Sequence, residues 1–573
     1  MFQRLNQAEQ FLFDLLSVSL VLFYAYAAVL EPAATQYHRG IYIVITYVLI
    51  FLLYRSDSRL GRALDYALIL LSIGTIGYWI INFETINYRA GAETTLDKIV
   101  AVVGVLLGVE LARRVIGSVF VIIGAVMLAY GVYGDYAPEI IAHAGDTFPN
   151  LCTNIFYKSD GVFGIMANVL ATYIVLFVIF GAFLEKSGAQ RFFIDFPLAA
   201  VGHKIGGPGK VSVIASGLFG SISGSAIANT VSTGTFTIPM MMKAGFRPHI
   251  AGGIEPAASI GGMFMPPIMG AGGFIMAELT GLPYSQIMLV ALFPALTYFF
   301  SVFLMVHFEA RKHNIVGPRS GASASGILKK QWFYVLPLVV ITVLMFLGYS
   351  PAYSAVLGLV TCIVISWFRR ETRIGPLRFV QASRAGTEAS LKIGATVGVI
   401  GIIIGVLTYS GLVLTFADIV IELAGGRLFL TILLIALASL VLGMGVPVTA
   451  SYLITAVVAV PALTHLGINE IAAHMIVYWL SQDSNITPPV CIAAFAGAAI
   501  AKANMWKTAF TAFKFAKFLY LAPFLFGYVP AFSLDGSASD IAVAFTLILA
   551  GTYAYSWLLS GIWLQRFRKQ SVR

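Results

Sequence analysis

Charged residues are scarce in this sequence of 573 residues. Only 11 % of the residues are charged, whereas a soluble domain typically carries about 25 %. Hydrophobic residues make up 59 % of the chain, and its mean hydropathy is +0.88. The deficit of charge therefore places most of the chain in a lipid bilayer and predicts an all-α polytopic membrane protein.

Cysteines are also few, and they do not form a recognisable pattern. Cys152, Cys362 and Cys491 are too widely separated for a disulfide framework or a metal site. The sequence likewise contains no histidine-rich cluster, no paired carboxylates at helical spacing and no Gly-x-Ser-x-Gly motif. It thus gives no support to a membrane-embedded enzyme, and we expect no catalytic residues and no cofactor.

The net charge of +10 raises the question of nucleic-acid binding. The basic residues lie in short clusters between apolar runs, which is typical of the cytoplasmic loops of a membrane protein. We therefore expect no nucleic-acid partner and both termini in the cytoplasm. No small-residue cleavage pattern precedes Glu31, so we expect the first apolar segment to be a retained span.

A membrane-spanning helix needs roughly 20 apolar residues, and by this measure the chain contains about 14 spans. Two other apolar segments, 207–243 and 428–464, have polar centres with glycine or proline and do not fit as single helices. The basic clusters stay on one side only if each of these segments enters and leaves the membrane on the same side. The sequence therefore predicts two re-entrant hairpins, hairpin one opening to the cytoplasm and hairpin two to the outside.

Two further segments combine polar residues with a proline pair. They read "SIGGMFMPPIMG" at 259–270 and "SQDSNITPPV" at 481–490. Proline removes a helix hydrogen bond and clashes with the preceding turn. We therefore predict helices broken within the membrane at about 250–279 and 471–500. The alternative is a pair of proline kinks that only shape the bundle.

The chain contains an internal repeat. A shift of 222 residues places Pro239 on Pro461 and the pair Pro266–Pro267 on Pro488–Pro489. The span count gives the two copies opposite orientations, so we predict an inverted-topology repeat. Such repeats place substrate and ion sites near the bilayer midplane, at discontinuous helices.

These motifs resemble a known family. The hairpin tips "SGSAIANTVSTG" and "GMGVPVTAS", paired with "GGMFMPP" and "SQDSNITPP", are similar to the large membrane subunit of tripartite ATP-independent periplasmic (TRAP) transporters. The resemblance covers the whole chain and is most specific over 165–505. Residues 1–112 would then be the four-helix scaffold that fused members carry as their small subunit, and 113–573 the transport unit. This fused arrangement is also usual among members served by TAXI-type binding proteins.

The resemblance implies an elevator-type fold of the ion-transporter superfamily and a location in the bacterial inner membrane. It also implies secondary uptake of a small organic anion, driven by a cation gradient, with the substrate delivered by a separate periplasmic binding protein. The coupling ion is Na⁺ or H⁺, and we expect the membrane component to be a monomer. A stand-alone cation/carboxylate symporter and an ion channel are the alternatives.

The placement of charge limits how a carboxylate could be bound. No Lys or Arg occurs in 211–242, 248–310 or 428–501, so hydroxyls, amides, helix N-termini and the coupling cations must hold the substrate. The candidate substrate-binding residues are Ser223, Ser225, Asn229, Thr449, Ser451, Ser484 and Asn485. The candidate ligands of the coupling cation are Ser221, Asn229, Gly261, Gly262, Pro266, Gly445, Asp483, Asn485 and Thr487.

Asp483 is the most informative of these residues, because an intramembrane carboxylate is a functional-site hypothesis by default. It could neutralise Na⁺ beside backbone carbonyls, carry a proton, or only cap the broken helix. Glu255 raises the same question, with an ion pair to His249 or Arg247 as the alternative.

Overall fold

The computed structural model describes residues 2–318, 321, 323–444 and 446–563. Within these residues the regular structure is helical, apart from one isolated bridge between Ile205 and Val316. Ten helical segments are long and apolar enough to cross a membrane. The prediction of an all-α polytopic membrane protein is confirmed, whereas the count of about 14 spans and the division at residue 112 stay predictions.

The chain folds into two compact units, which are described separately. Unit one comprises Met1–Lys186, Tyr349–Leu423 and Gly445–Ala462, and unit two comprises Ser187–Gly348, Ala424–Met444 and Leu463–Arg573. The segments of hairpin one and of both predicted broken helices all belong to unit two. The two halves of hairpin two fall in different units.

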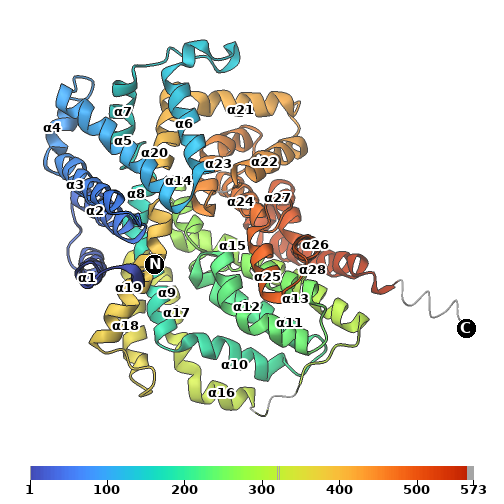
Figure 1. The fold of residues 1–573 in the computed structure, drawn as a ribbon. Helices are drawn as coiled ribbons and strands as arrows, with labels where there is room; N and C mark the ends of the chain where they lie inside the picture. Colours follow the sequence, from blue (N-terminus) through green and yellow to red (C-terminus); the bar gives the residue numbers. More distant parts are fainter. Residues whose placement is uncertain (1, 319–320, 322, 445, 564–573) are drawn as a thin grey trace, which may run out of the picture. The chain divides into compact units, whose positions relative to one another are not determined.

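Unit one contains the N-terminal helices, drawn in blue in Figure 1. Asp14 on α1 accepts two hydrogen bonds from the guanidinium of Arg384 on α19, at 2.6 and 2.5 Å. This bidentate pair joins segments that are far apart in the sequence. The helices of unit one are α1 (Gln7–Val29), α2 (Thr35–Leu53), α3 (Arg59–Ile81), α4 (Phe83–Tyr88), α5 (Thr95–Val115), α6 (Ser118–Val132), α7 (Phe148–Tyr157), α8 (Ile165–Val169), α9 (Val175–Lys186), α18 (Pro351–Ser366), α19 (Pro376–Gly394), α20 (Val397–Ser410), α21 (Leu412–Leu423) and α23 (Val448–His465).

Unit two is built around α13, which contacts α11, α12, α25 and α26. Helices α11, α12 and α13 lie side by side in Figure 1. The helices of unit two are α10 (Ala189–Val201), α11 (Gly207–Ser223), α12 (Ala226–Lys243), α13 (Pro248–Gly261), α14 (Gly272–Thr280), α15 (Tyr284–Lys312), α16 (Ala324–Gln331), α17 (Leu336–Phe346), α22 (Leu428–Leu442), α24 (Glu470–Ser481), α25 (Ile492–Ala501), α26 (Met505–Phe515), α27 (Phe518–Tyr528) and α28 (Ala538–Ser560).

The segment of hairpin one is a pair of helices with a tight tip. Helix α11 ends at Gly224, whose φ of 64° suits glycine because it has no Cβ. Ser225 then caps α12 by accepting a hydrogen bond from the Ala228 amide at 3.3 Å. Glycine and serine thus supply the reversal and the helix start, while entry from one side of a membrane stays a prediction.

Both segments predicted as broken helices are interrupted at their proline pairs. Helix α13 ends at Gly261, and α14 begins only at Gly272. Helix α24 ends at Ser481 and is followed by a 3₁₀ turn, Asp483–Asn485, before α25 begins at Ile492. The chain is therefore non-helical where the sequence placed the breaks.

The local structure follows the internal repeat. Helix α23 begins and ends 222 residues after α12. Positive φ angles recur at the same shift, at Gly245 and Gly467 and at Met269 and Cys491. The repeat is thus visible in helix boundaries and turns, and the opposite orientation of its copies stays a prediction.

Candidate functional site

Hairpin one and the first broken helix enclose a buried carboxylate, Glu255 on α13. Its side chain is 0 % exposed. Ser216 and Thr237 each donate a hydroxyl hydrogen bond to it at 2.5 Å, and Ser212 and Thr233 donate two more. These donors come from α11 and α12, so one carboxylate joins three helices.

The four hydroxyl residues were not identified from the sequence. Ser212 and Ser216 are four residues apart on α11, and so are Thr233 and Thr237 on α12. Residues at this spacing share one face of a helix. The matching hydroxyl pairs on the two arms of the hairpin could therefore have indicated a shared polar partner. The alternative of an ion pair between Glu255 and His249 or Arg247 is wrong, because the carboxylate instead accepts from these hydroxyls.

The Glu255 cluster also orients Asn229, a predicted ligand of both substrate and cation. Asn229 is fully buried, and its Nδ2 donates to the backbone carbonyl of Ser216 at 2.9 Å. Its Oδ1 has no hydrogen-bond partner among the described residues. Amide oxygens are suitable ligands for hard cations, so the cluster holds one such oxygen in a fixed place.

The tip of hairpin one lies directly against the first break. A Cβ built on Gly262 would lie 2.4 Å from the Cα of Gly220 and 3.0 Å from the amide nitrogen of Ser221. A Cβ on Gly220 would lie 2.6 Å from Nδ2 of Asn229. Three predicted cation-site residues, Ser221, Asn229 and Gly262, are thus brought together. Gly261 instead faces the ring of Tyr298.

We expect Gly262→Ala to destabilise this contact. Gly262 has a φ of −60° and a ψ of −26°, which alanine adopts easily, so the clash with Gly220 is the main effect. Overpacking of this kind costs about 1–3 kcal/mol and should lower the thermal unfolding temperature of the detergent-purified protein. Gly77→Ala on α3 is the matched control, since nothing lies within 4 Å of its Cβ position. Equal unfolding temperatures for the two variants would contradict the contact.

The second break holds Asp483 in a buried 3₁₀ turn. Its side chain is 5 % exposed, and Oδ1 finds no hydrogen-bond partner in the described part of the chain. The same holds for Oε1 of the neighbouring Gln482, which is 0 % exposed. Nδ2 of Asn485 donates to the Gln482 carbonyl at 3.1 Å. The second break therefore carries two buried acceptor oxygens without a hydrogen-bond partner among the residues that the structure describes.

Other predicted residues of this break have partners. The hydroxyl of Thr487 lies 2.7 Å from that of Tyr520. Ser484 lies against Gly443 in the segment after α22, because a Cβ built on that glycine would lie 2.6 Å from its Oγ. The end of α22 and the second break are therefore neighbours within unit two.

The two broken helices are also bound to each other. The Tyr478 hydroxyl on α24 lies 2.6 Å from the carbonyl oxygens of both Met263 and Met269 in the first break. Phe264 stacks on Trp479 with ring centroids 4.0 Å apart. Non-helical backbone inside a membrane protein needs such partners, because lipid supplies none.

Comparison with known proteins identifies the family. Residues 103–532 match the family described as tripartite ATP-independent periplasmic transporter, DctM component. The chain belongs to this TRAP family. It is therefore a membrane transport protein rather than an enzyme, and the resemblance predicted from its motifs is confirmed. Membership implies partnership with a periplasmic substrate-binding protein and a place in the inner membrane.

Several TRAP permeases are similar to the chain. A putative TRAP transporter large permease protein of Haemophilus influenzae is 25 % identical over 55 % of this chain and 74 % of the relative. The C4-dicarboxylate TRAP transporter large permease protein DctM of Pseudomonas aeruginosa is 24 % identical over 70 % and 91 %, respectively. The crystal structure of the YdaH transporter of Alcanivorax borkumensis aligns with a TM-score of 0.49 and 15 % identity, over 75 % of this chain and 99 % of that one.

The remaining predicted residues of this TRAP permease are placed as follows. Thr449 and Ser451 lie on α23 in unit one, both buried, and neither hydroxyl has a hydrogen-bond partner among the residues described. The Ser223 hydroxyl lies 3.5 Å from the carbonyl oxygens of Gly220 and Ser225. Gly445 lies outside the described residues. Pro266 is half-buried, in the break that Tyr478 holds.

Proposed function

We propose that this chain is the fused membrane component of a TRAP transporter, of the kind served by TAXI-type binding proteins. It takes up a small organic anion, driven by a Na⁺ or H⁺ gradient, after a periplasmic protein has delivered the substrate. The proposal is supported by relatives named for C4-dicarboxylate, sialic acid and 2,3-diketo-L-gulonate. The family match begins at residue 103, which leaves α1, α2 and α3 for a segment like the small subunit.

The observation that carries the proposal is the set of buried acceptor oxygens at the tip and at the second break. Oδ1 of Asn229, Oδ1 of Asp483 and Oε1 of Gln482 have no hydrogen-bond partner within the described residues. Leaving a buried polar atom unpaired costs free energy, and a bound cation would remove that cost. Asp483 is the one carboxylate in this set, so it would carry the charge that neutralises the cation.

The same oxygens explain how an anion could be held without a basic side chain. A bound cation would supply the positive charge, and the hydroxyls and amides of the tips would orient the carboxylate. The Glu255 cluster fixes Asn229 for this role through Ser216. Hairpin two, with Thr449 and Ser451, would contribute its own hydroxyls.

Transport would follow the elevator mechanism. The hairpins and broken helices would move together across the bilayer, while residues 1–112 would stay fixed as a scaffold. The bonds from Tyr478 to Met263 and Met269 support movement of the two breaks as one body. The membrane component would act as a monomer with both termini in the cytoplasm.

We expect uptake only when a periplasmic binding protein is supplied. The test uses the purified chain in proteoliposomes, with and without a periplasmic TRAP binding protein for each probe. Radiolabelled C4-dicarboxylate and sialic acid serve as probes, under an inward Na⁺ or H⁺ gradient. Saturable uptake that stops when the gradient is collapsed is the expected result.

The same assay distinguishes the alternatives. Full uptake by the membrane protein alone, unchanged when the binding protein is added, would indicate a stand-alone symporter. Flux that does not saturate and continues without a gradient would indicate a channel.

A further inference from the structure

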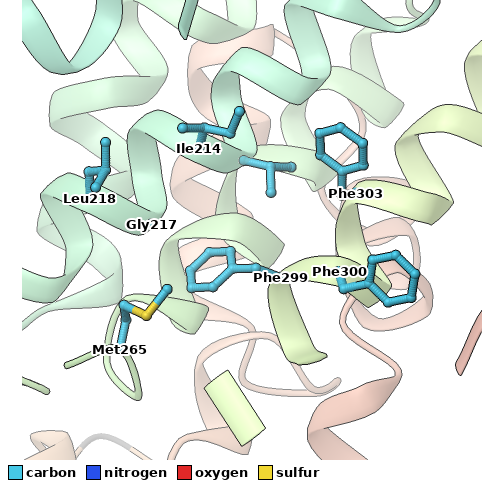
Figure 2. Close-up of a pocket in the computed structure, with 8 residues that line it drawn as sticks. Ile214, Gly217, Leu218, Met265, Phe299, Phe300 and Phe303 are labelled. Carbon is cyan, nitrogen blue, oxygen red and sulfur yellow. The ribbon is translucent and has the colours of Figure 1, made fainter. Parts of the chain in front are cut away.

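An apolar pocket of about 250 Å³ opens between α11 and α15 in unit two. Ile214, Gly217 and Leu218 line it from α11, and Phe299 and Phe303 line it from α15. Figure 2 shows these residues around the opening between the two helices. A Cβ built on Gly217 would lie 3.0 Å from the Phe299 ring, so the glycine keeps this end of the pocket open.

One end of the pocket is basic. Lys210 lies one helical turn before Ile214 on α11, and its Nζ is 4.9 Å from the centre of the Phe303 ring. The same Nζ is 3.1 Å from Nδ1 of His307, one turn after Phe303 on α15. The two helices run antiparallel here, since Lys210 meets His307 while Gly217 meets Phe299. Both helices therefore place a basic side chain at the same end of an apolar pocket.

Further basic residues surround this end. Lys204 lies six residues before Lys210, and Arg311 lies one helical turn after His307 on α15. Both are exposed. The nearby carboxylate of Glu309 lies 3.3 Å from His313. Lys210 donates a hydrogen bond to Nδ1 of His307, and the positive charges of Lys204, Lys210 and Arg311 favour an anion that binds among them.

We propose that α11 and α15 form a binding site for an anionic phospholipid. The lipid phosphate binds at Lys210 and His307, and one acyl chain fills the apolar pocket. Basic pockets between membrane helices on the cytoplasmic side are suited to lipid head groups, and the charge pattern predicts that 204–210 and 309–314 face the cytoplasm. Lys210 itself is only 6 % exposed, as expected of a built site rather than a loose surface charge.

The test measures lipid retention by native mass spectrometry of the full purified chain. Phosphatidylglycerol and phosphatidylcholine with identical acyl chains are added separately. We expect the wild type to retain phosphatidylglycerol preferentially, and Lys210→Gln to weaken this binding about fivefold, the effect of one basic residue near an anionic lipid. Lys210→Arg should restore it. Lys243→Gln, at the exposed end of α12, removes the same charge elsewhere and should bind as the wild type does.

Two further arms keep the proposal open to contradiction. Gly217→Leu fills the pocket and should weaken phosphatidylglycerol binding, although the basic residues are unchanged. If Lys210→Gln fails to fold, His307→Gln tests the basic end instead. Inorganic phosphate is added as a competitor. Any of three results would overturn the proposal. The first is equal retention of the two lipids, and the second is unchanged binding in both Lys210→Gln and Gly217→Leu. The third is displacement of the lipid by phosphate alone.

Discussion

Glu255→Leu should abolish uptake and lower the thermal stability of the purified protein. The carboxylate accepts hydroxyl hydrogen bonds from both arms of hairpin one, and leucine accepts none. Thr233 and Thr237 can still bond to backbone carbonyls at 2.7 and 3.1 Å, but Ser212 would be left buried without its acceptor. An unpaired buried group costs about 1–3 kcal/mol, and we expect a loss of stability in this range, measured by thermal unfolding in detergent.

A milder variant separates stability from transport. Glu255→Gln keeps one acceptor oxygen and the shape of the side chain, so it should unfold closer to the wild type and show weaker cation dependence. Glu422→Leu on α21 is the control, because this glutamate is exposed. Wild-type uptake and stability in Glu255→Leu would show that the cluster neither holds the hairpin nor orients Asn229.

Asp483→Asn should weaken the apparent affinity for Na⁺ by at least about tenfold, as changes around metal sites commonly do. The amide keeps the size of the side chain and one acceptor oxygen, so the fold should be preserved. The substitution removes the negative charge. Asp483 is only 5 % exposed, and its Oδ1 lacks a hydrogen-bond partner within the described residues. The measurement is binding-protein-dependent uptake, titrated against Na⁺ at constant pH.

A second titration, against pH at constant Na⁺, distinguishes the other roles of Asp483. If the residue carries H⁺, the Asn variant should lose its pH dependence and keep its Na⁺ dependence. If it is only a helix cap, neither titration should change, and Asp483→Leu should chiefly cost stability. Asp195→Asn on α10 is the control, since its side chain is 40 % exposed. If the Asn variant keeps the wild-type dependence on both ions, the roles of Asp483 as a Na⁺ ligand and as a proton carrier are rejected.

The sequence was most informative where the structure depends on local backbone chemistry. Proline pairs and glycines end helices through their own geometry, so both breaks, and a tip of hairpin one within "SGSAIANTVSTG", could be predicted from the sequence. The internal repeat was recognised from the same kinds of residue. The boundaries of α12 and α23 differ by the same 222 residues.

The polar contacts between elements could not be predicted in the same way. The hydroxyl partners of Glu255 lie 18 to 43 residues away in the sequence, and only the packing of α13 against hairpin one brings them together. Basic residues close in the sequence suggested an ion pair instead. The contact between Tyr478 and Met263 spans 215 residues. A substrate site shared by the residues of both hairpins stays a prediction, because Thr449 and Ser451 belong to unit one.

The bonds from Tyr478 also limit how the first break can vary in length. Its single hydroxyl meets the carbonyls of Met263 and Met269, both at 2.6 Å, so the backbone between them must span a fixed distance. An ordinary surface loop tolerates inserted or deleted residues. Here the loss or gain of one residue between 264 and 268 would move one carbonyl out of reach and leave it unpaired. Among related permeases, we expect substitutions in this segment but almost no insertions or deletions.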